Sequence, residues 1–323
     1  MKKQCPVCNN PRCEVGPGGH MGFPLHDCPR CGAYVVVGHA DQSLPALLSH
    51  RRIDRSVLSH LIRKAQRHGR PLTIFDEDLA AYEHASPLPT PREQVDNLIR
   101  WIGENQTSPD EPARANIELI AATVGAQVSA PESNESAFQW LIAEIGNENL
   151  FVWDARQPAV QVLLRLRMKG WELYEQLRHR IADVRTAFMA MQFGNAELMS
   201  VLERCFKPAV KRAGFDLRAL NELQPAGLID NQIRAAIRSA RFVVADLSHD
   251  NNGAYFEAGF AEGIGLPVLY TCRREKFEAE KTHFDTNHMV TIPWDLDDLD
   301  DAAKRLTATI RVTLPGEADH DAV

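Results

Sequence analysis

The clearest fold signal of the chain lies in residues 242–269, which read FVVADLSHDNNGAYFEAGFAEGIGLPVL. The apolar run 242–245 predicts a buried strand that ends at Asp246, and the polar residues after it predict a loop. A helix over 255–263 and a second apolar strand over 267–270 follow. Strand, helix and strand in this order, with uninterrupted apolar strands, are typical of a parallel sheet covered on both faces.

The same alternation of apolar runs and helical patterns extends over the last third of the chain. It predicts a strand over 186–191, helices over 198–213 and 228–238, and a last helix over 302–314. We therefore expect a C-terminal domain over residues 183–315, with a flavodoxin-like parallel sheet and helices on both faces. Residues 316–323 are acidic and are expected to form a disordered tail.

Two carboxylates of this domain are candidates for chemistry. Asp246 ends a buried strand, at the carboxyl edge of the sheet where open α/β folds bind ligands. Glu257 lies in the first turns of the following helix, where we expect the helix dipole to keep its carboxylate ionised. An ionised carboxylate there suits a nucleophile or a group that stabilises positive charge.

The motifs of this domain resemble the nucleoside 2-deoxyribosyltransferase-like superfamily, a neighbour of the TIR-type NAD hydrolases. The match is a strand that ends in Asp, an Asn-containing loop, and aromatic-Glu-x-Gly-x-Ala before a Pro-Val strand. The segment AFMAMQFG (187–194) is similar to the first strand and nucleotide-contacting loop of that superfamily, and the segments 207–210, 213–215 and 283–287 follow in family order. The resemblance covers about 130 residues.

The resemblance implies a site for breaking a nucleotide N-glycosidic bond. Glu257 would be the nucleophile or would stabilise an oxocarbenium-like transition state. Asn252 and Asn251 would orient Glu257 or bind ribose hydroxyls, and Asp246 would hold the loop or a ribose. The nucleotide-binding set would comprise Phe188, Met191, Phe193, Gly194, Asn251 and Gly253, with the two phenylalanines against the base.

Two departures from the family pattern bear on the substrate. Ala240 and Arg241 stand where relatives often have an Asp before the strand, and the acidic loop residue of the transferases is Asn here. Both changes remove an acid that would protonate a leaving base. A cationic leaving group, such as the nicotinamide of NAD, needs no such acid. We therefore favour hydrolysis of NAD or a related nucleotide or nucleoside over a deoxyribosyltransferase-like activity. The alternatives are a regulator that senses a nucleotide without cutting it, and a purely structural domain.

The front of the chain carries a metal-site pattern. Cys5-x-x-Cys8 and Cys28-x-x-Cys31 are separated by nineteen residues, and each pair begins a tight turn. Four thiolates in two such knuckles are the ligand set of structural zinc. We expect residues 1–40 to be similar to a zinc ribbon. The intervening Cys13, His20 and His26 are left out, because four ligands already close the site.

The middle of the chain suggests a binding module. Residues 41–91 predict a helical segment with a basic face, ended by a proline-rich linker, and residues 92–180 resemble a winged-helix domain. This architecture invites nucleic-acid binding. However, the expected recognition helix over 134–145 contains acidic residues and no Lys or Arg, so contact with a protein partner stays the alternative.

Composition limits the remaining function classes. The chain of 323 residues is 44% hydrophobic with a formal charge of −7, which disfavours a protein whose main task is to coat nucleic acid. It has no apolar run long enough to cross a bilayer and no signal-peptide core, so we expect a cytoplasmic protein without a membrane partner. Analogy of architecture suggests a bacterial defence or stress effector that self-association into a homo-oligomer switches on.

Overall fold

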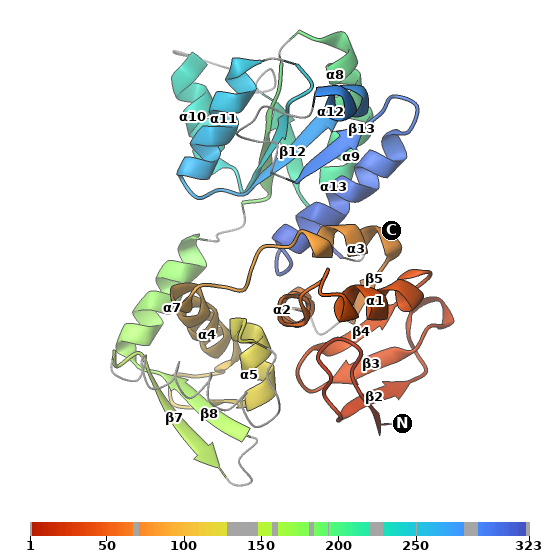
Figure 1. The fold of residues 1–323 in the computed structure, drawn as a ribbon. Coiled ribbons are helices and arrows are strands. Elements are labelled where there is room, and N and C mark those ends of the chain that lie inside the picture. The colour runs from red at the N-terminus through yellow and green to blue at the C-terminus, as the bar shows by residue number, and fades with distance from the viewer. Residues whose placement is uncertain are drawn as a thin grey trace. The chain divides into compact units, whose positions relative to one another are not determined.

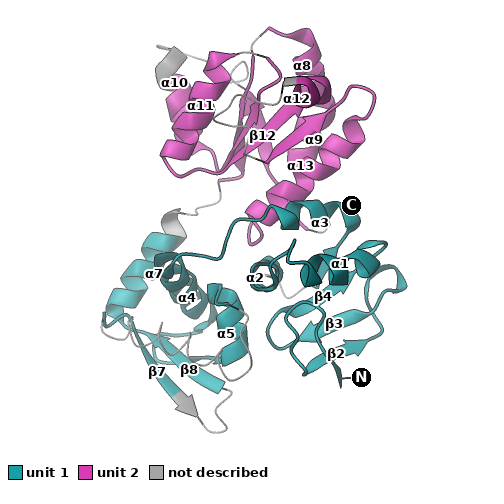
Figure 2. Cartoon of the chain, in the orientation of Figure 1, with its two compact units in different colours: residues 1–182 teal, residues 183–323 magenta. Residues whose placement is uncertain are grey.

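The computed structural model divides the chain into two compact units, residues 1–182 and 183–323 (Figure 2). It describes residues 2–66, 71–127, 148–156, 161–180, 184–192, 194–219, 229–249, 251–280 and 290–320. The recognition helix expected over 134–145 and the 283–287 motif lie outside these ranges. Among the described residues, no helix combines the length and the apolar character that a bilayer crossing needs.

Unit 2 is built on a five-stranded sheet in which every neighbouring pair is parallel (Figure 1). Its strands, in the order of the sheet, are β10 (Asp216–Ala219), β9 (Thr186–Ala190), β11 (Val243–Asp246), β12 (Val268–Arg273) and β13 (Thr291–Trp294). Val243 pairs with Phe188 on one side and with Val268 on the other. The mixed α/β class with a parallel sheet is thus confirmed.

Helices cover both faces of this sheet. Successive side chains of a strand point to opposite faces, and here both sets are apolar. Met189, Val244 and Leu269 belong to one core cluster, and Phe188, Val243 and Tyr270 belong to the other. The first face is covered by α8 (Ala196–Val201), a π-helical turn (Leu202–Phe206), α9 (Lys207–Arg212) and α13 (Leu299–Thr313). The second is covered by α10 (Ile229–Ser239) and α11 (Asn252–Gly263), and α12 (Arg274–Glu280) follows β12.

The helix expected over 198–213 is interrupted by the π-helical turn. Pro208 lies at the start of α9. Proline has no backbone N–H and cannot continue the regular hydrogen-bond ladder of an α-helix. The wider turn before it is a known way for a helix to accommodate such a break.

The end of the chain corrects the expected disordered tail over 316–323. The Glu317 carboxylate accepts from Arg241 at 2.6 Å (Nε) and 2.8 Å (Nη2), and Asp319 N donates to Ala213 O at 2.9 Å. A two-point guanidinium–carboxylate pair fixes geometry as well as charge. Residues 316–320 are therefore part of the domain.

Unit 1 begins with a second five-stranded sheet in the order β1 to β5. Its strands are β1 (Lys2–Lys3), β2 (Cys13–Gly16), β3 (Leu25–Cys28), β4 (Gly32–Val36) and β5 (Leu72–Ile74). The first four pair antiparallel, whereas β5 pairs parallel to β4. Strand β5 comes from the segment 41–91 that we expected to be helical and separate, so residues 1–40 and this segment share one sheet.

The helices of this first part differ from the single periodic stretch seen in the sequence. The structure contains a short 3-10 turn (His20–Gly22), α1 (Ala40–Ser49), α2 (Arg55–Ala65) and α3 (Asp76–Glu83). Helix α1 ends at Ser49, and a new helix, α2, begins after the N-cap residue Asp54. The carboxylate of Asp54 accepts from Ser56 N at 2.7 Å and Val57 N at 3.0 Å. This is the usual N-cap arrangement.

The rest of unit 1 combines helices with a three-stranded antiparallel sheet in the order β6-β8-β7. Its elements are α4 (Pro91–Asn105), β6 (Ala113–Asn116), α5 (Ile117–Val124), β7 (Phe151–Arg156), β8 (Gln161–Leu166) and α7 (Met168–Arg180). Thr90 and Glu93 cap α4 reciprocally. Strands β7 and β8 form the longest antiparallel pair of this sheet, with Phe151 opposite Leu166.

Candidate functional site

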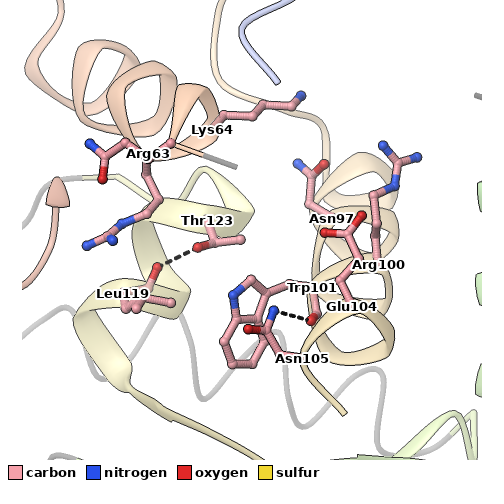
Figure 3. Close-up of a pocket in the computed structure, with 10 residues that line it drawn as sticks. Arg63, Lys64, Asn97, Arg100, Trp101, Glu104, Asn105, Leu119 and Thr123 are labelled. Carbon is pink, nitrogen blue, oxygen red and sulfur yellow. Dashed lines mark hydrogen bonds between the residues drawn. The ribbon is translucent and has the colours of Figure 1, made fainter. Parts of the chain in front are cut away.

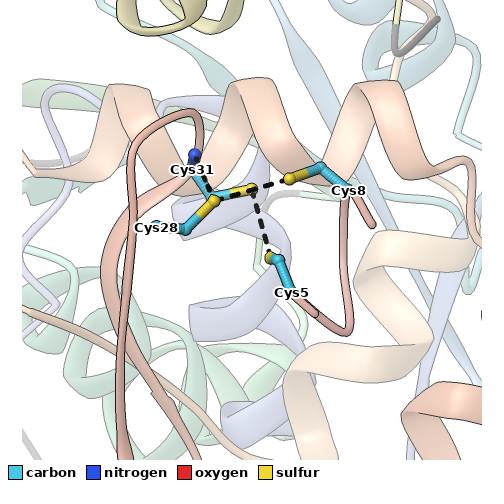
Figure 4. A group of neighbouring side chains, drawn as sticks. All are labelled: Cys5, Cys8, Cys28 and Cys31. Atoms are coloured by element: carbon cyan, nitrogen blue, oxygen red, sulfur yellow. Dashed lines mark hydrogen bonds between the residues drawn. The ribbon is translucent and has the colours of Figure 1, made fainter. Parts of the chain in front are cut away.

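Four buried cysteines form the most compact group of potential metal ligands among the described residues (Figure 4). Cys5 and Cys8 lie in the turn before β2, Cys28 ends β3, and Cys31 precedes β4. The Sγ atoms of Cys5 and Cys31 are 3.9 Å apart, those of Cys8 and Cys28 are 3.5 Å apart, and all four lie within 4.8 Å of one another.

These distances fit a tetrahedral ion. Zinc–thiolate bonds of about 2.3 Å place the sulfurs of a regular tetrahedron about 3.8 Å apart. The backbone of the second Cys-x-x-Cys turn also stabilises a thiolate, because Cys31 N donates to Cys28 Sγ at 3.4 Å. Gly32 completes the turn with φ of 85°, a conformation that favours glycine. The four cysteines that the sequence singled out can therefore hold a metal ion.

Polar groups around the sulfurs tie the cluster to the rest of unit 1. Tyr34 Oη lies 3.1 Å from Cys5 Sγ, and Ser59 Oγ, from α2, lies 3.3 Å from Cys31 Sγ. The buried Arg30 donates from Nε to Ser59 Oγ at 3.3 Å and from Nη2 to Ala126 O at 2.6 Å. Such outer groups orient metal ligands.

The basic face expected on the first helical segment has a structural role. Arg63 donates to the carbonyls of Arg30 at 2.7 Å and Pro29 at 3.0 Å, and Arg55 donates to those of Pro6 and Val7 at 2.8 Å. The two arginines thus hold the two cysteine knuckles. They are engaged within the protein, which weakens the case for reading this face as a nucleic-acid surface.

The residues left out of the ligand set lie outside the four-sulfur cluster. Cys13 is fully buried in β2, and its thiol hydrogen-bonds to Cys5 without joining the group of four. The His26 ring stacks on Tyr34 with centroids 5.0 Å apart and an angle of 15° between the planes. Burial lowers the pKa of His26, which keeps the stacked ring neutral.

Asp246, at the end of β11, is an anchor of the sheet. Its carboxylate is 2% exposed and accepts from Thr271 Oγ1 at 2.8 Å, Trp294 Nε1 at 2.7 Å and Ser248 N at 3.0 Å. Burial raises the pKa of Asp246, while these hydrogen bonds act to lower it. These partners enclose the carboxylate, so Asp246 fixes the start of the loop after β11. Its side chain is not accessible to a substrate, which corrects the expected catalytic role.

Glu257 lies in the second turn of α11 and is half-buried. Burial raises the pKa of Glu257 to about 7. This corrects the expectation that the helix dipole keeps the carboxylate ionised, since that effect fades beyond the first turn. No hydrogen bond or ion pair joins Glu257 to the described part of the chain.

The spacing of α11 shows where Glu257 lies on the helix. Ala254, Ala258 and Ala261 are buried against the sheet, while Phe256 lies under Arg234 of α10, with the guanidinium 5.6 Å from the ring centre. Residues three or four apart share a helix face. Glu257 therefore lies between the face packed on the sheet and the face turned to α10.

The asparagine loop begins α11. Asn251 is the N-cap, and its Oδ1 accepts from Gly253 N at 3.1 Å. Asn252 and Gly253 are exposed at the first helical positions. These three residues therefore lie at the carboxyl edge of the sheet, as expected, about a turn and a half before Glu257.

The expected nucleotide-contacting residues separate into two groups. Phe188 and Met191 are 2% and 6% exposed and belong to the cores on the two faces of the sheet, so they are not available to a base. Gly194 is exposed with φ of 75°. Phe193 lies outside the described residues. The apolar character of strand β9 explains the error: it marks burial rather than base stacking.

Sequence reasoning missed a polar cluster at the same edge. Asn195 Nδ2 lies 2.6 Å from His249 Nε2, and Arg273 pairs with Glu197 at 3.0 Å. Arg273 N also donates to Ser248 Oγ at 2.7 Å. Asn195 before a helix is an N-cap signal that could have been recognised, because its Oδ1 accepts from Leu198 N. The pairing with His249 has no local signal.

We compared the chain with known protein families, curated proteins and solved structures. No protein-family model, curated protein or solved structure matches the chain.

Proposed function

We propose that unit 2 is a nucleotide N-glycosidase that acts on NAD or a related nucleotide, with Glu257 as the reacting carboxylate. The observation that carries the proposal is the setting of Glu257, which is half-buried, has a pKa raised to about 7, and lacks a compensating partner within the described residues. A carboxyl group kept in such a position reduces stability, and perturbed groups of this kind concentrate at functional sites.

The topology favours a ligand site beside this residue. In the strand order β10-β9-β11-β12-β13, the chain leaves β9 toward one face of the sheet and leaves β11 toward the other. Parallel sheets bind ligands at the carboxyl edge between two such strands. We infer a flavodoxin-like arrangement, with Asn252, Gly253 and Gly194 at the mouth of the site.

The charge of Glu257 supports a cationic substrate. The ionised form is the one that attacks or stabilises an oxocarbenium-like carbon. A bound substrate with a positively charged ring would lower the pKa of Glu257 and favour that form. A nicotinamide leaving group also needs no general acid.

We assign the front of the chain a structural and regulatory role. The four-cysteine cluster is proposed to hold structural zinc, since a closed set of four thiolates leaves no position for a substrate. Residues 92–180 are proposed to be a winged-helix-like module that contacts a protein or nucleic-acid partner. Self-association is the proposed switch.

Base release from NAD and from nucleosides tests the activity. We expect the full-length protein to release nicotinamide from NAD, measured by chromatography, and Glu257→Gln to lower the rate at least 100-fold. Glu262→Gln is the matched control, because Glu262 lies on the same helix, is exposed and accepts from Tyr270 Oη at 3.0 Å. Tight NAD binding without release by the unmodified protein would instead support the nucleotide-sensing regulator.

A further inference from the structure

The start of α5, in the part of unit 1 formed by residues 92–180, is held by the first Cys-x-x-Cys turn. Glu118 accepts from Asn10 Nδ2 at 2.9 Å and pairs with Arg12 at 2.7 Å. Asn10 closes that turn, because its carbonyl accepts from Cys5 N at 2.9 Å. The first turn of α5 is therefore joined to the chain that carries two of the four cysteines.

The end of α5 is held by the second Cys-x-x-Cys turn and by α2. Arg30, inside the second turn, donates from Nη2 to Ala126 O at 2.6 Å, just beyond the helix. His60, on α2, places Nδ1 2.7 Å from Ala122 O in the last turn of α5. The last carbonyls of a helix lack partners within it, and a cation there also meets the negative end of the helix dipole. The two donors therefore stabilise the end of α5.

The contact at the end of α5 leads directly to a cysteine sulfur. Arg30 Nε donates to Ser59 Oγ at 3.3 Å, and this oxygen lies 3.3 Å from Cys31 Sγ. Arg30 and Ser59 are buried, so neither can exchange its partner for water unless the structure opens. A change in the position of Cys31 therefore disturbs the donor to Ala126 O.

Packing between the two parts of unit 1 is incomplete beside these contacts. A cavity of about 290 Å³ lies between α2, α4 and α5 (Figure 3). The core of residues 92–180 is built from its own side chains, between Leu98 and Leu177. The polar contacts at the two ends of α5 therefore matter more for joining the two parts than they would across a filled interface.

We propose that metal binding at the four cysteines fixes α5, so that the metal site controls the module of residues 92–180. The inference rests on the zinc assignment made above and is independent of Glu257. A bound ion holds the two Cys-x-x-Cys turns in a tetrahedral arrangement, and the turns hold the two ends of the helix. Without the ion, the turns lose the constraint that folds them, and α5 loses its contacts with Asn10, Arg12 and Arg30. The ion is thus a regulatory ligand of the module as well as a structural one.

Hydrogen–deuterium exchange of the full-length protein tests the proposal, with zinc analysis of the same samples. Removing zinc with a chelator should speed exchange in residues 113–126 by at least about tenfold, while residues 251–263 of unit 2 stay unchanged. Arg30→Met removes the guanidinium and should speed exchange at the end of α5 by at least about fivefold with zinc still bound. Arg52→Met is the control, because Arg52 pairs with Glu83 instead, and it should match the unmodified protein.

Zinc affinity gives an independent test, because a coupling between two sites is reciprocal. Glu118→Gln removes the charge that pairs with Arg12, and Glu118 lies on α5 rather than in a Cys-x-x-Cys turn. This variant should bind zinc at least about threefold more weakly in competition with a chromophoric chelator. Glu111→Gln, which replaces an exposed carboxylate that accepts from Thr107, is the matched control and should keep the affinity.

The outcomes separate this inference from the earlier proposals. If the unmodified protein binds no zinc, both the zinc assignment and the control of α5 are wrong. If zinc binds but its removal leaves exchange in residues 113–126 unchanged, or if Arg30→Met and Glu118→Gln both behave as their controls, only the control of α5 is overturned. Nicotinamide release is assigned to Glu257 in unit 2, so its absence does not affect this test.

Discussion

The cysteine cluster of unit 1 and the carboxyl edge of unit 2 are both built from buried polar groups, but they differ in how far those groups are satisfied. Around the cysteines, Arg30 and Ser59 hydrogen-bond to each other, and Ser59 reaches Cys31. At the carboxyl edge, Asp246 has three donors while Glu257, eleven residues later, has no hydrogen-bond or ion-pair partner among the described residues.

This difference separates structure from chemistry. A buried polar group with all its partners stabilises one conformation, whereas one without them reduces stability and is available to a ligand. The cysteine cluster and Asp246 belong to the first kind, and Glu257 belongs to the second. Substitutions of the two kinds of group should therefore have opposite consequences for stability.

The largest effect is expected from loss of the metal site. Cys28→Ser, or removal of metal with a chelator, should unfold the cysteine-containing part of unit 1, because structural zinc contributes about 10–16 kcal/mol of binding free energy to small domains. Metal analysis should find one zinc per chain before the change and none after it. Cys13→Ser is the control and should retain the zinc; loss of metal from this variant would show that the ligand set is wrong.

An intermediate effect is expected at Asp246. Asp246→Ala leaves Thr271 Oγ1, Trp294 Nε1 and Ser248 N without their acceptor, and each unsatisfied buried group costs about 1–3 kcal/mol. Urea denaturation should show unit 2 destabilised by at least about 3 kcal/mol. The exposed Asp216, replaced by Ala, should change stability by less than about 1 kcal/mol. Equal effects of the two changes would contradict the anchoring role.

A smaller effect of opposite sign is expected at Glu257. Its pKa is about 7 in the folded protein and 4.5 in the reference state, so the folded state binds the additional proton between these values. Stability should therefore fall as the pH rises from about 4.5 to 7. Glu257→Gln should abolish this decline and stabilise the protein by about 1–2 kcal/mol at pH 8, with little change at pH 4. Urea denaturation at both pH values measures this difference in stability. If the Glu257→Gln variant is less stable than the unmodified protein at pH 8, the carboxylate has a stabilising partner and the interpretation is wrong.

The features that the sequence predicts well are those encoded locally. The two Cys-x-x-Cys turns specify their own geometry, and the run from Phe242 to Asp246 identifies a buried parallel strand without reference to the rest of the chain. The grouping of the four cysteines and the α/β class with a parallel sheet were therefore predicted correctly.

The errors concern partners that are distant in sequence. The donors to Asp246 come from Thr271 and Trp294, 25 and 48 residues later, so its enclosure has no local signal. Arg55 and Arg63 appear as a basic helix face, but their acceptors lie in the cysteine knuckles about 33 to 49 residues earlier. Phe188, in the middle of β9, was assigned to a base through the family resemblance, and an apolar strand pattern does not reveal which of its side chains the helices cover.

The ion pair between Arg241 and Glu317 has a practical consequence for producing the protein. Arg241 lies two residues before β11, and its N–H donates to Thr186 O of β9, so the final segment supports the start of the central strands. A protein shortened after Pro315 would leave this guanidinium half-buried and without its counter-charge. Residues 316–320 should be retained whenever unit 2 is produced alone.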